Sequence, residues 1–189
     1  MNIRLYKTAD CEEIIKLFYE TVHSINAGDY TKSQLEAWAP KQIDITEWDK
    51  SFSKDYTIVV ENSGKIVGFA NLDHTGYFDK LFVHKDHQGQ GIATIIANEL
   101  EKYSQENDIR VITVEASITA KPFFEKRGYF TVKQQEVERK GQLLTNFIMK
   151  KSELPSCFFR DFSEELRDVR NVEEASYEEF AKLVLKNKE

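Results

Sequence analysis

The stretch from Leu81 to Leu100, LFVHKDHQGQGIATIIANEL, constrains the fold more than any other part of the chain. It begins with three apolar residues, which are typical of the end of a buried strand, and then passes through a polar, glycine-containing turn. The run that follows has apolar residues at spacings of three and four: Ile92, Ile95, Ile96, Leu100 and Tyr103. This period predicts a helix with one buried face. The stretch therefore predicts a strand that turns through small residues into a helix.

Such a turn leaves several backbone N–H groups without partners at the N-terminus of the helix. Together with the positive end of the helix dipole, these donors form a natural site for a phosphate or pyrophosphate. Glycine suits this position because a Cβ would keep the anion away from the backbone. On spacing alone, a tight glycine-rich turn without a ligand is the alternative interpretation.

Two well-known anion-binding motifs do not fit these residues. A Walker A loop ends in Gly-Lys-Ser/Thr, whereas isoleucine and alanine follow Gly91. The dinucleotide motif GxGxxG begins at Gly89 and Gly91, but it has Thr94 in place of the third glycine and no βαβ pattern ahead of it. The segment does fit the pattern Q/R-x-x-G-x-G/A, which Gln88, Gly91 and Ala93 supply.

Length and composition predict a soluble globular chain. With 189 residues, 41% hydrophobic and 31% charged, one domain with an appendage is expected. The formal net charge of −6 argues against a nucleic-acid partner, because neutralising phosphates requires a basic surface. Cys11 and Cys157 lie far apart, with no histidine at metal-ligand spacing, so neither a disulfide framework nor a metal site is expected.

No membrane partner is expected, because no apolar run approaches the roughly 20 residues that a membrane span requires. The opening residues, MNIRLYKTAD, lack the apolar core of a signal peptide. We therefore expect a cytoplasmic protein.

The remaining pattern predicts alternating strands and helices. Strands are expected at residues 2–7, 56–60, 66–72, 76–83, 111–115, 130–137 and 142–149. Helices are expected after residue 10, then at 30–38, 44–52, 92–105 and 117–126. Residues 151–189, with seven Lys/Arg against ten Asp/Glu, carry two further helical patterns. We expect domain 1–150 to be followed by a C-terminal helical extension, 151–189, that packs on the domain or in a homodimer. Alternatively, the extension binds a partner or covers the substrate.

Residues 2–150 resemble the GNAT superfamily of N-acyltransferases through the Gln88–Ala93 motif, the strand before it and the order of the elements. They are most similar to a bacterial branch of the YafP type, which shares residues 118–125, ITAKPFFE, and residues 131–135, TVKQQ. The same branch also shares an early helix with Ala37-Trp38-Ala39 and the ending Thr145-Asn146-Phe147. The resemblance implies an α/β fold of the mixed (α+β) type, with a central, splayed β-sheet flanked by helices.

The resemblance implies acetyl-CoA as the co-substrate and no metal. Backbone groups at the strand end should contact the pantetheine arm: Leu81, Phe82 and Val83. Backbone N–H groups of the turn should hold the pyrophosphate: Gln88, Gly89, Gln90, Gly91, Ile92, Ala93 and Thr94. The strand at 111–115 should diverge from the strand at 76–83, so that pantetheine takes the place of a missing strand. The helix with Phe124 would line the other side of the cofactor.

The implied reaction is attack of an amine on a thioester. An aliphatic ammonium has a reference pKa of about 10.4, so roughly one molecule in a thousand is unprotonated at neutral pH, and a base is useful. The family often places this base four residues before the valine of the strand, which is Asp79 here. Strand alternation puts Asp79 on the same face as buried residues. Burying a carboxylate there costs free energy, so we expect Asp79 to have either a functional role or an interaction partner. Alternatively, Asp79 pairs with a lysine or caps a loop. Asp73 and His74 form a second candidate pair, although His74 could equally be an exposed turn residue.

Many members of the family carry a tyrosine that protonates the departing thiolate, and Phe124 occupies that position here. A thiol pKa of about 8.5 makes the thiolate a tolerable leaving group, so catalysis remains feasible without the acid. Tyr129 and Tyr77 could substitute or could simply pack. No Ser-His-Asp or Cys-His arrangement indicates a covalent intermediate, so direct transfer in a ternary complex is predicted.

Candidates for contact with the acceptor are His23, Tyr30, Trp38 and Tyr77, although aromatic residues at helical spacing commonly pack in a core. The expected function is acetyl transfer from acetyl-CoA to an amine, either a small molecule or a protein amino group. The alternative is an acyl-CoA-binding regulatory or sensor protein without efficient turnover, which the phenylalanine at position 124 motivates. An interaction module built around the C-terminal extension would leave the glycine loop unexplained.

Overall fold

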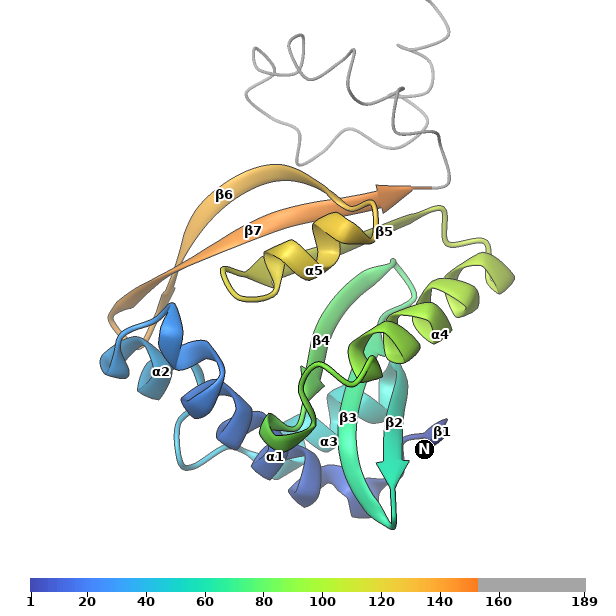
Figure 1. Cartoon of the computed structure of the whole chain (residues 1–189), viewed down its shortest axis with the longest axis horizontal. Helices are drawn as coiled ribbons and strands as arrows, with labels where there is room; N and C mark the ends of the chain where they lie inside the picture. Colours follow the sequence, from blue (N-terminus) through green and yellow to red (C-terminus); the bar gives the residue numbers. More distant parts are fainter. Residues whose placement is uncertain (153–189) are drawn as a thin grey trace, which may run out of the picture. The chain divides into compact units, whose positions relative to one another are not determined.

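The computed structural model describes residues 1–152, so the predicted C-terminal extension lies outside the described residues from position 153 onward. The described residues contain a seven-stranded sheet in the order β1-β2-β3-β4-β5-β7-β6 (Figure 1). Its strands are β1 (Asn2–Leu5), β2 (Tyr56–Asn62), β3 (Lys65–Leu72), β4 (Tyr77–Val83), β5 (Val111–Ser117), β6 (Phe130–Arg139) and β7 (Gln142–Ser152). Neighbouring strands are antiparallel except for β4 and β5, so the sheet is mixed.

Helices cover both faces of the sheet: α1 (Cys11–Ser24), α2 (Lys32–Trp38), α3 (Ile45–Lys54), α4 (Ile92–Glu106) and α5 (Lys121–Lys126). One core cluster joins the sheet to α4 and α5 and includes Ile58 and Val60 of β2. A second cluster joins it to α1, α2 and α3 and includes the intervening Val59. Since successive side chains of a strand point to opposite faces, the two clusters lie on opposite sides of the sheet. The predicted mixed α/β fold is confirmed.

Local sequence explains where several helices begin. Thr31 caps α2 in a capping box with Gln34, and the Asp44 carboxylate accepts hydrogen bonds from the first-turn N–H groups of α3. The helix predicted at 117–126 is shorter, because Ser117 stays in β5 and its hydroxyl accepts a hydrogen bond of 3.1 Å from Ala120 N–H. The resulting turn delays the start of α5.

Two irregularities of β4 shape the centre of the molecule. In the pairing with β3, Asn71 lies opposite Lys80 and Leu72 lies opposite Phe78, so Asp79 is the extra residue of a β-bulge. In the pairing with β5, only Tyr77 and Phe78 have partners. Beyond Phe78 the two parallel strands diverge, as the family resemblance implies.

Within residues 1–152, no helix is both long and apolar enough to cross a membrane. The same residues contain no group of three or more His, Cys, Asp or Glu side chains arranged to hold a metal ion.

Candidate active site

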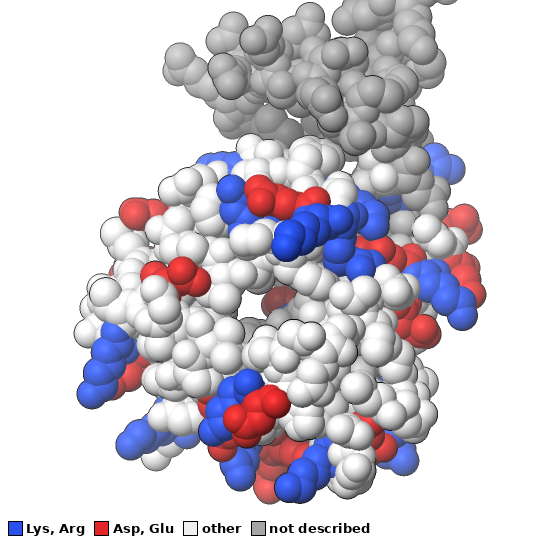
Figure 2. Space-filling model, viewed as in Figure 1, with Lys and Arg blue, Asp and Glu red and all other residues white. Residues whose placement is uncertain are grey.

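A cavity of about 930 Å³ opens where β4 and β5 diverge. Figure 2 shows a hollow on the face seen in Figure 1, with red Asp or Glu atoms visible inside it. Most of the residues predicted from the sequence line this cavity: Tyr30, Trp38, Tyr77, Asp79, Leu81, Phe82, Val83, Gln88, Gly89, Gly91, Ile92, Ala93, Thr94 and Phe124. Residues from distant parts of the chain therefore meet in one place.

The glycine turn forms the N-terminus of α4 at one end of the cavity. Gly91 is the N-cap residue, with φ of +79° in the left-handed region, and no side chain caps the helix there. The first helical hydrogen bond runs from Ile95 N–H to the Gly91 carbonyl oxygen over 3.0 Å, so the N–H groups before it are available to an anion. A Cβ built on Gly89 or Gly91 would meet no atom within 4 Å. The space beside these two glycines is therefore open to a ligand, and the turn fits a pyrophosphate group.

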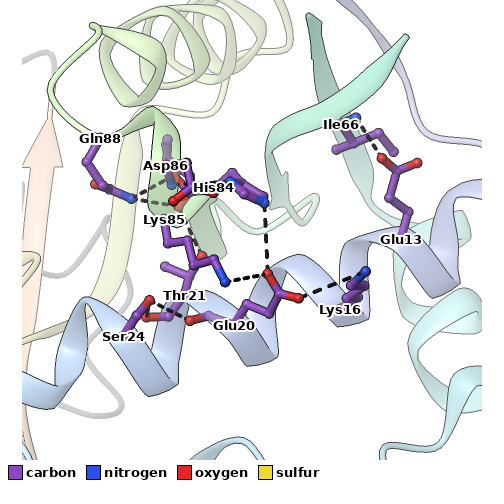
Figure 3. Close-up of polar contacts among 11 residues, drawn as sticks. Glu13, Lys16, Glu20, Thr21, Ser24, Ile66, His84, Lys85, Asp86 and Gln88 are labelled. Carbon is purple, nitrogen blue, oxygen red and sulfur yellow. Dashed lines mark hydrogen bonds and ion pairs between the residues drawn. The ribbon is translucent and has the colours of Figure 1, made fainter.

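Two side chains hold the strand end that leads into this turn (Figure 3). The Thr21 hydroxyl of α1 donates a hydrogen bond of 3.1 Å to the Val83 carbonyl oxygen, and the Gln88 side-chain amide donates one of 2.6 Å to the same atom. The Gln88 side chain is therefore engaged with the strand end. Gln88 could therefore contact an anion through its backbone N–H group and not through its side chain.

An ion pair fixes the same segment to α1 (Figure 3). The Lys85 ammonium lies 3.1 Å from the Glu20 carboxylate, and this hydrogen-bonded contact lowers the pKa of Glu20, against a smaller opposing effect of burial. His84 Nε2 lies 3.9 Å from Glu20, while its Nδ1 accepts a hydrogen bond from Asp86 N–H. These contacts position the turn relative to α1.

Asp79 lies in the cavity, but its surroundings differ from the sequence expectation. The alternation that placed it with buried residues is wrong, because the bulge interrupts the alternation at this position, and 31% of its side chain is exposed. Its carboxylate forms an ion pair with Lys80 and lies 3.5 Å from Nδ2 of the fully buried Asn71. Asn71 Nδ2 also donates a hydrogen bond of 2.8 Å to Asp55. The Asp79 carboxylate is thus positioned by Lys80 and Asn71 beside an open cavity, where it can accept a proton or bind an ammonium group.

Lys80 connects this carboxylate to aromatic rings. Its ammonium lies 5.1 Å from the ring centroid of Trp48 and 5.6 Å from that of Phe52. An ammonium group is thus accommodated between a carboxylate and a tryptophan ring at this end of the cavity.

Asp73 and His74 are not brought to the cavity, which corrects the expectation of a second catalytic pair. Asp73 Oδ1 accepts hydrogen bonds from Thr75 N–H, the Thr75 hydroxyl and Tyr77 N–H, and so caps the turn between β3 and β4. Burial raises the pKa of Asp73, but these hydrogen bonds outweigh it and leave the pKa below its ordinary value. His74 is exposed in the same turn. Asp73 therefore stabilises the hairpin turn, and His74 lies in that turn.

The side chain of Phe124 is 2% exposed, and its ring packs against Phe78 and Tyr129 with centroids 5.7 and 5.0 Å apart. Tyr129 does not line the cavity, whereas Tyr77 does. Burial, followed by the charges of Glu115 and Asp79, raises the pKa of Tyr77, so its phenol stays protonated at neutral pH. Of the two tyrosines considered as substitutes for the missing acid, Tyr77 is therefore the one that lines the cavity.

Other predicted contacts have structural roles. His23 Nε2 lies 2.8 Å from the Ala39 carbonyl oxygen, and neither His23 nor the exposed Gln90 lines the cavity. The Tyr30 hydroxyl donates to the Thr145 carbonyl oxygen over 2.7 Å and accepts from Ile118 N–H over 2.9 Å. Tyr30 therefore joins the N-terminal region to β7 at the cavity wall.

Several cavity residues were not identified from the sequence, and they come from α3, β4, β5 and the β6–β7 hairpin. These residues are Glu47, Trp48, Lys80, Glu115, Arg139, Lys140 and Asn146. They belong to segments far apart along the chain, and no motif or spacing connects them. Only Glu115 interrupts an otherwise largely apolar strand and so offers a weak local signal.

The chain has counterparts among known proteins. A family model described as an acetyltransferase (GNAT) domain matches residues 26–151, and a model described as a domain of unknown function matches residues 145–189. The uncharacterized N-acetyltransferase YafP of Escherichia coli strain K12 is 37% identical over 151 residues, which cover 79% of this chain and 95% of YafP.

Two crystal structures are similar. A GCN5-related N-acetyltransferase from Rhodopseudomonas palustris has 32% sequence identity and a TM-score of 0.77, covering 80% of this chain and 94% of that chain. The PaiA N-acetyltransferase from Thermoplasma acidophilum, in complex with coenzyme A, has a TM-score of 0.66 at 17% identity, covering 80% and 98% of the two chains. This second likeness concerns the fold alone.

The fold and these matches define the class of the protein as an N-acetyltransferase. The chain belongs to the GNAT acetyltransferase family, and the predicted resemblance is confirmed.

Proposed function

We propose that this enzyme transfers an acetyl group from acetyl-CoA to an amine by direct attack in a ternary complex. The observation that carries the proposal is the single cavity that connects the uncapped N-terminus of α4 to the Asp79 carboxylate through the divergence of β4 and β5. One end offers backbone N–H groups to an anion. The other end offers a carboxylate beside aromatic rings.

The donor would bind along this divergence. The backbone N–H groups from Gln88 to Thr94 would hold the pyrophosphate, because the two glycines leave the space beside them open. The edge of β4 from Leu81 to Val83 has no strand partner on the β5 side, so its backbone groups can pair with the amides of the pantetheine arm. Phe124 and Phe123 would line the opposite wall.

Asp79 would act on the acceptor. Acetyl-CoA supplies the activated acetyl group as a thioester. Asp79 takes a proton from the acceptor ammonium, directly or through one water, and the free amine attacks the carbonyl carbon as the C–S bond breaks. The second proton of the nitrogen reaches the departing thiolate through water. Since a thiol has a pKa of about 8.5, the thiolate can leave without a dedicated acid at position 124.

A second function is favoured by one observation, the buried Phe124, which cannot donate a proton. A chain that binds acyl-CoA without efficient turnover would serve as a sensor or regulator. The two functions differ in turnover, since both require acetyl-CoA binding. A cytoplasmic location and a homodimer remain predictions.

Calorimetry with acetyl-CoA, followed by measurement of CoA release with a panel of amines, tests the proposal. Saturable binding together with amine-dependent CoA release supports the transferase. Binding without release from any amine would support the sensor. Absence of binding would refute both functions.

A further inference from the structure

The tip of the β6–β7 hairpin brings two cations to the cavity wall. Arg139 and Lys140 both line the cavity, and neither forms a salt bridge with any of residues 1–152. By contrast, the third cationic side chain on the wall, Lys80, is paired with Asp79. An arginine without an anionic partner among the described residues of an acidic protein is a candidate contact for an anionic group of a ligand.

Carboxylates reach the same part of the cavity from other elements. Asp79 comes from β4, and Glu115 comes from β5, where its carboxylate accepts a hydrogen bond of 3.0 Å from Asn146 of β7. Both residues are exposed to the cavity rather than enclosed in the core. The wall therefore presents charges of both signs.

Tyr77 indicates that these opposite charges are close together. The pKa of Tyr77 is raised by burial and then by Glu115 and Asp79, whereas Arg139 lowers it in part. All four residues line the same cavity; Asp79 is two positions from Tyr77 on β4, and Glu115 is two positions from Thr113, the residue of β5 that pairs with Tyr77. The positive and negative groups thus surround a common volume.

Aromatic rings form the apolar part of this volume. Trp48 and Phe82 each pack against Phe18, with ring centroids 5.0 and 4.8 Å apart, and Trp38 lies 6.3 Å from Phe82. All four rings line the cavity. An acceptor in this position would meet an aromatic surface, carboxylates and a guanidinium group at once.

We propose that the acceptor is an amine that also carries an oxyanion, either a carboxylate or a phosphate. Asp79 and Glu115 receive the amino group, and Arg139 binds the oxyanion with Lys140 beside it. The planar guanidinium group can donate two parallel hydrogen bonds to a carboxylate or phosphate. Its positive charge offsets the negative net charge of the protein, which otherwise disfavours binding of an anion. This inference rests on the proposed acetyltransferase function.

Matched pairs of amines test the inference. Leucine is compared with isopentylamine for the carboxylate, and O-phosphoethanolamine is compared with ethanolamine for the phosphate. In at least one pair we expect the anionic member to have a kcat/KM at least about tenfold higher, mainly through a lower KM. Arg139→Gln should reduce this ratio to near one. Lys133→Gln, which removes an exposed charge from the same strand outside the cavity, should leave the ratio as it is in the wild type.

A binding measurement accompanies the kinetics. The chain has two tryptophans, Trp38 and Trp48, and both line the cavity, so intrinsic fluorescence reports on ligands bound there. Titration with the same four amines should give tighter binding of an anionic member to the wild type than to Arg139→Gln.

Three outcomes would overturn the inference. The first is the absence of a preference for the anionic member in either pair, and the second is an equal reduction of the kcat/KM ratio in Arg139→Gln and Lys133→Gln. The third is the absence of binding of any of the four amines. If acetyl-CoA still binds and CoA is released with other amines, the acetyltransferase function stands and only the acceptor class is refuted.

Discussion

The Thr21 hydroxyl donates a hydrogen bond of 3.1 Å to the carbonyl oxygen of Val83, a residue 62 positions later in the chain. Thr21 belongs to α1, which lines the proposed acceptor end of the cavity through Phe18, and Val83 ends the strand that leads into the glycine turn. Gln88 donates to the same oxygen. The Val83 carbonyl group therefore connects α1, at one end of the proposed site, to the glycine turn at the other end.

This anchor predicts a non-additive pair of substitutions. Thr21→Val and Gln88→Ala should each lower the free energy of unfolding by about 1 kcal/mol, because one donor to the Val83 carbonyl remains. The double variant should lose more than the sum, since it leaves the carbonyl without a protein donor. Urea denaturation of the three variants provides the measurement. Strictly additive losses would show that the two donors act independently.

Gly91→Val should abolish acetyl-CoA binding while the protein stays folded. Its φ of +79° strains any residue with a Cβ by about 1–2 kcal/mol, and the new side chain would enter the space assigned to the pyrophosphate. Gly64→Val is the matched control, since Gly64 has a φ of +76° and lies outside the cavity, in the turn between β2 and β3. Both variants should lose similar stability in urea. Calorimetry should show lost affinity in Gly91→Val alone, and an unchanged affinity there would refute the pyrophosphate assignment.

Asp79→Asn should lower turnover about 100-fold or more and change acetyl-CoA affinity little, because it removes the proposed base. The deficit should shrink as pH rises from about 6 to about 9, since more of the acceptor amine is then already deprotonated. Asp73→Asn is the control outside the cavity and should reduce stability through the hairpin turn, with the pH profile unaltered. Equal rates for Asp79→Asn and wild type across this pH range would exclude Asp79 as the base.

Asp10 should make the stability of the fold depend on acidic pH. Burial raises its pKa, but Arg4 at 2.7 and 2.8 Å and Lys7 N–H at 2.8 Å outweigh this effect, so the pKa is lowered from 3.8. A lowered folded-state pKa means that the ionised carboxylate stabilises the protein above pH 3.8. This contribution is lost as the pH falls through the folded-state pKa. The urea stability of the wild type should exceed that of Asp10→Asn at neutral pH, and the gap should narrow below about pH 4. A gap that is constant with pH would contradict this account.

The sequence predicts those features that depend on neighbouring residues. Apolar spacing predicts α4, and the pattern from Gln88 to Ala93 predicts the glycine turn before it, because helix periodicity and positive φ angles are local properties. The order of strands and helices follows from the same local patterns, and together with the shared segments it identifies the family. The divergence of β4 and β5 follows from the family resemblance and is present in the structure.

Only the tertiary structure decides which side chains reach the cavity. The bulge at Asp79 arises from the pairing of β3 with β4. Strand alternation predicts a buried position for this carboxylate, but because of the bulge it is exposed in the cavity. Asp73 and His23 carry suitable chemistry, but hairpin and helix contacts hold them elsewhere. Arg139 reaches the cavity because the β6–β7 hairpin packs beside α2. Strand register and packing between distant segments set these positions, and neither is encoded in the spacing of neighbouring residues. The glycine turn thus determines the proposed donor site locally, whereas the proposed acceptor site forms only when distant strands and helices pack together.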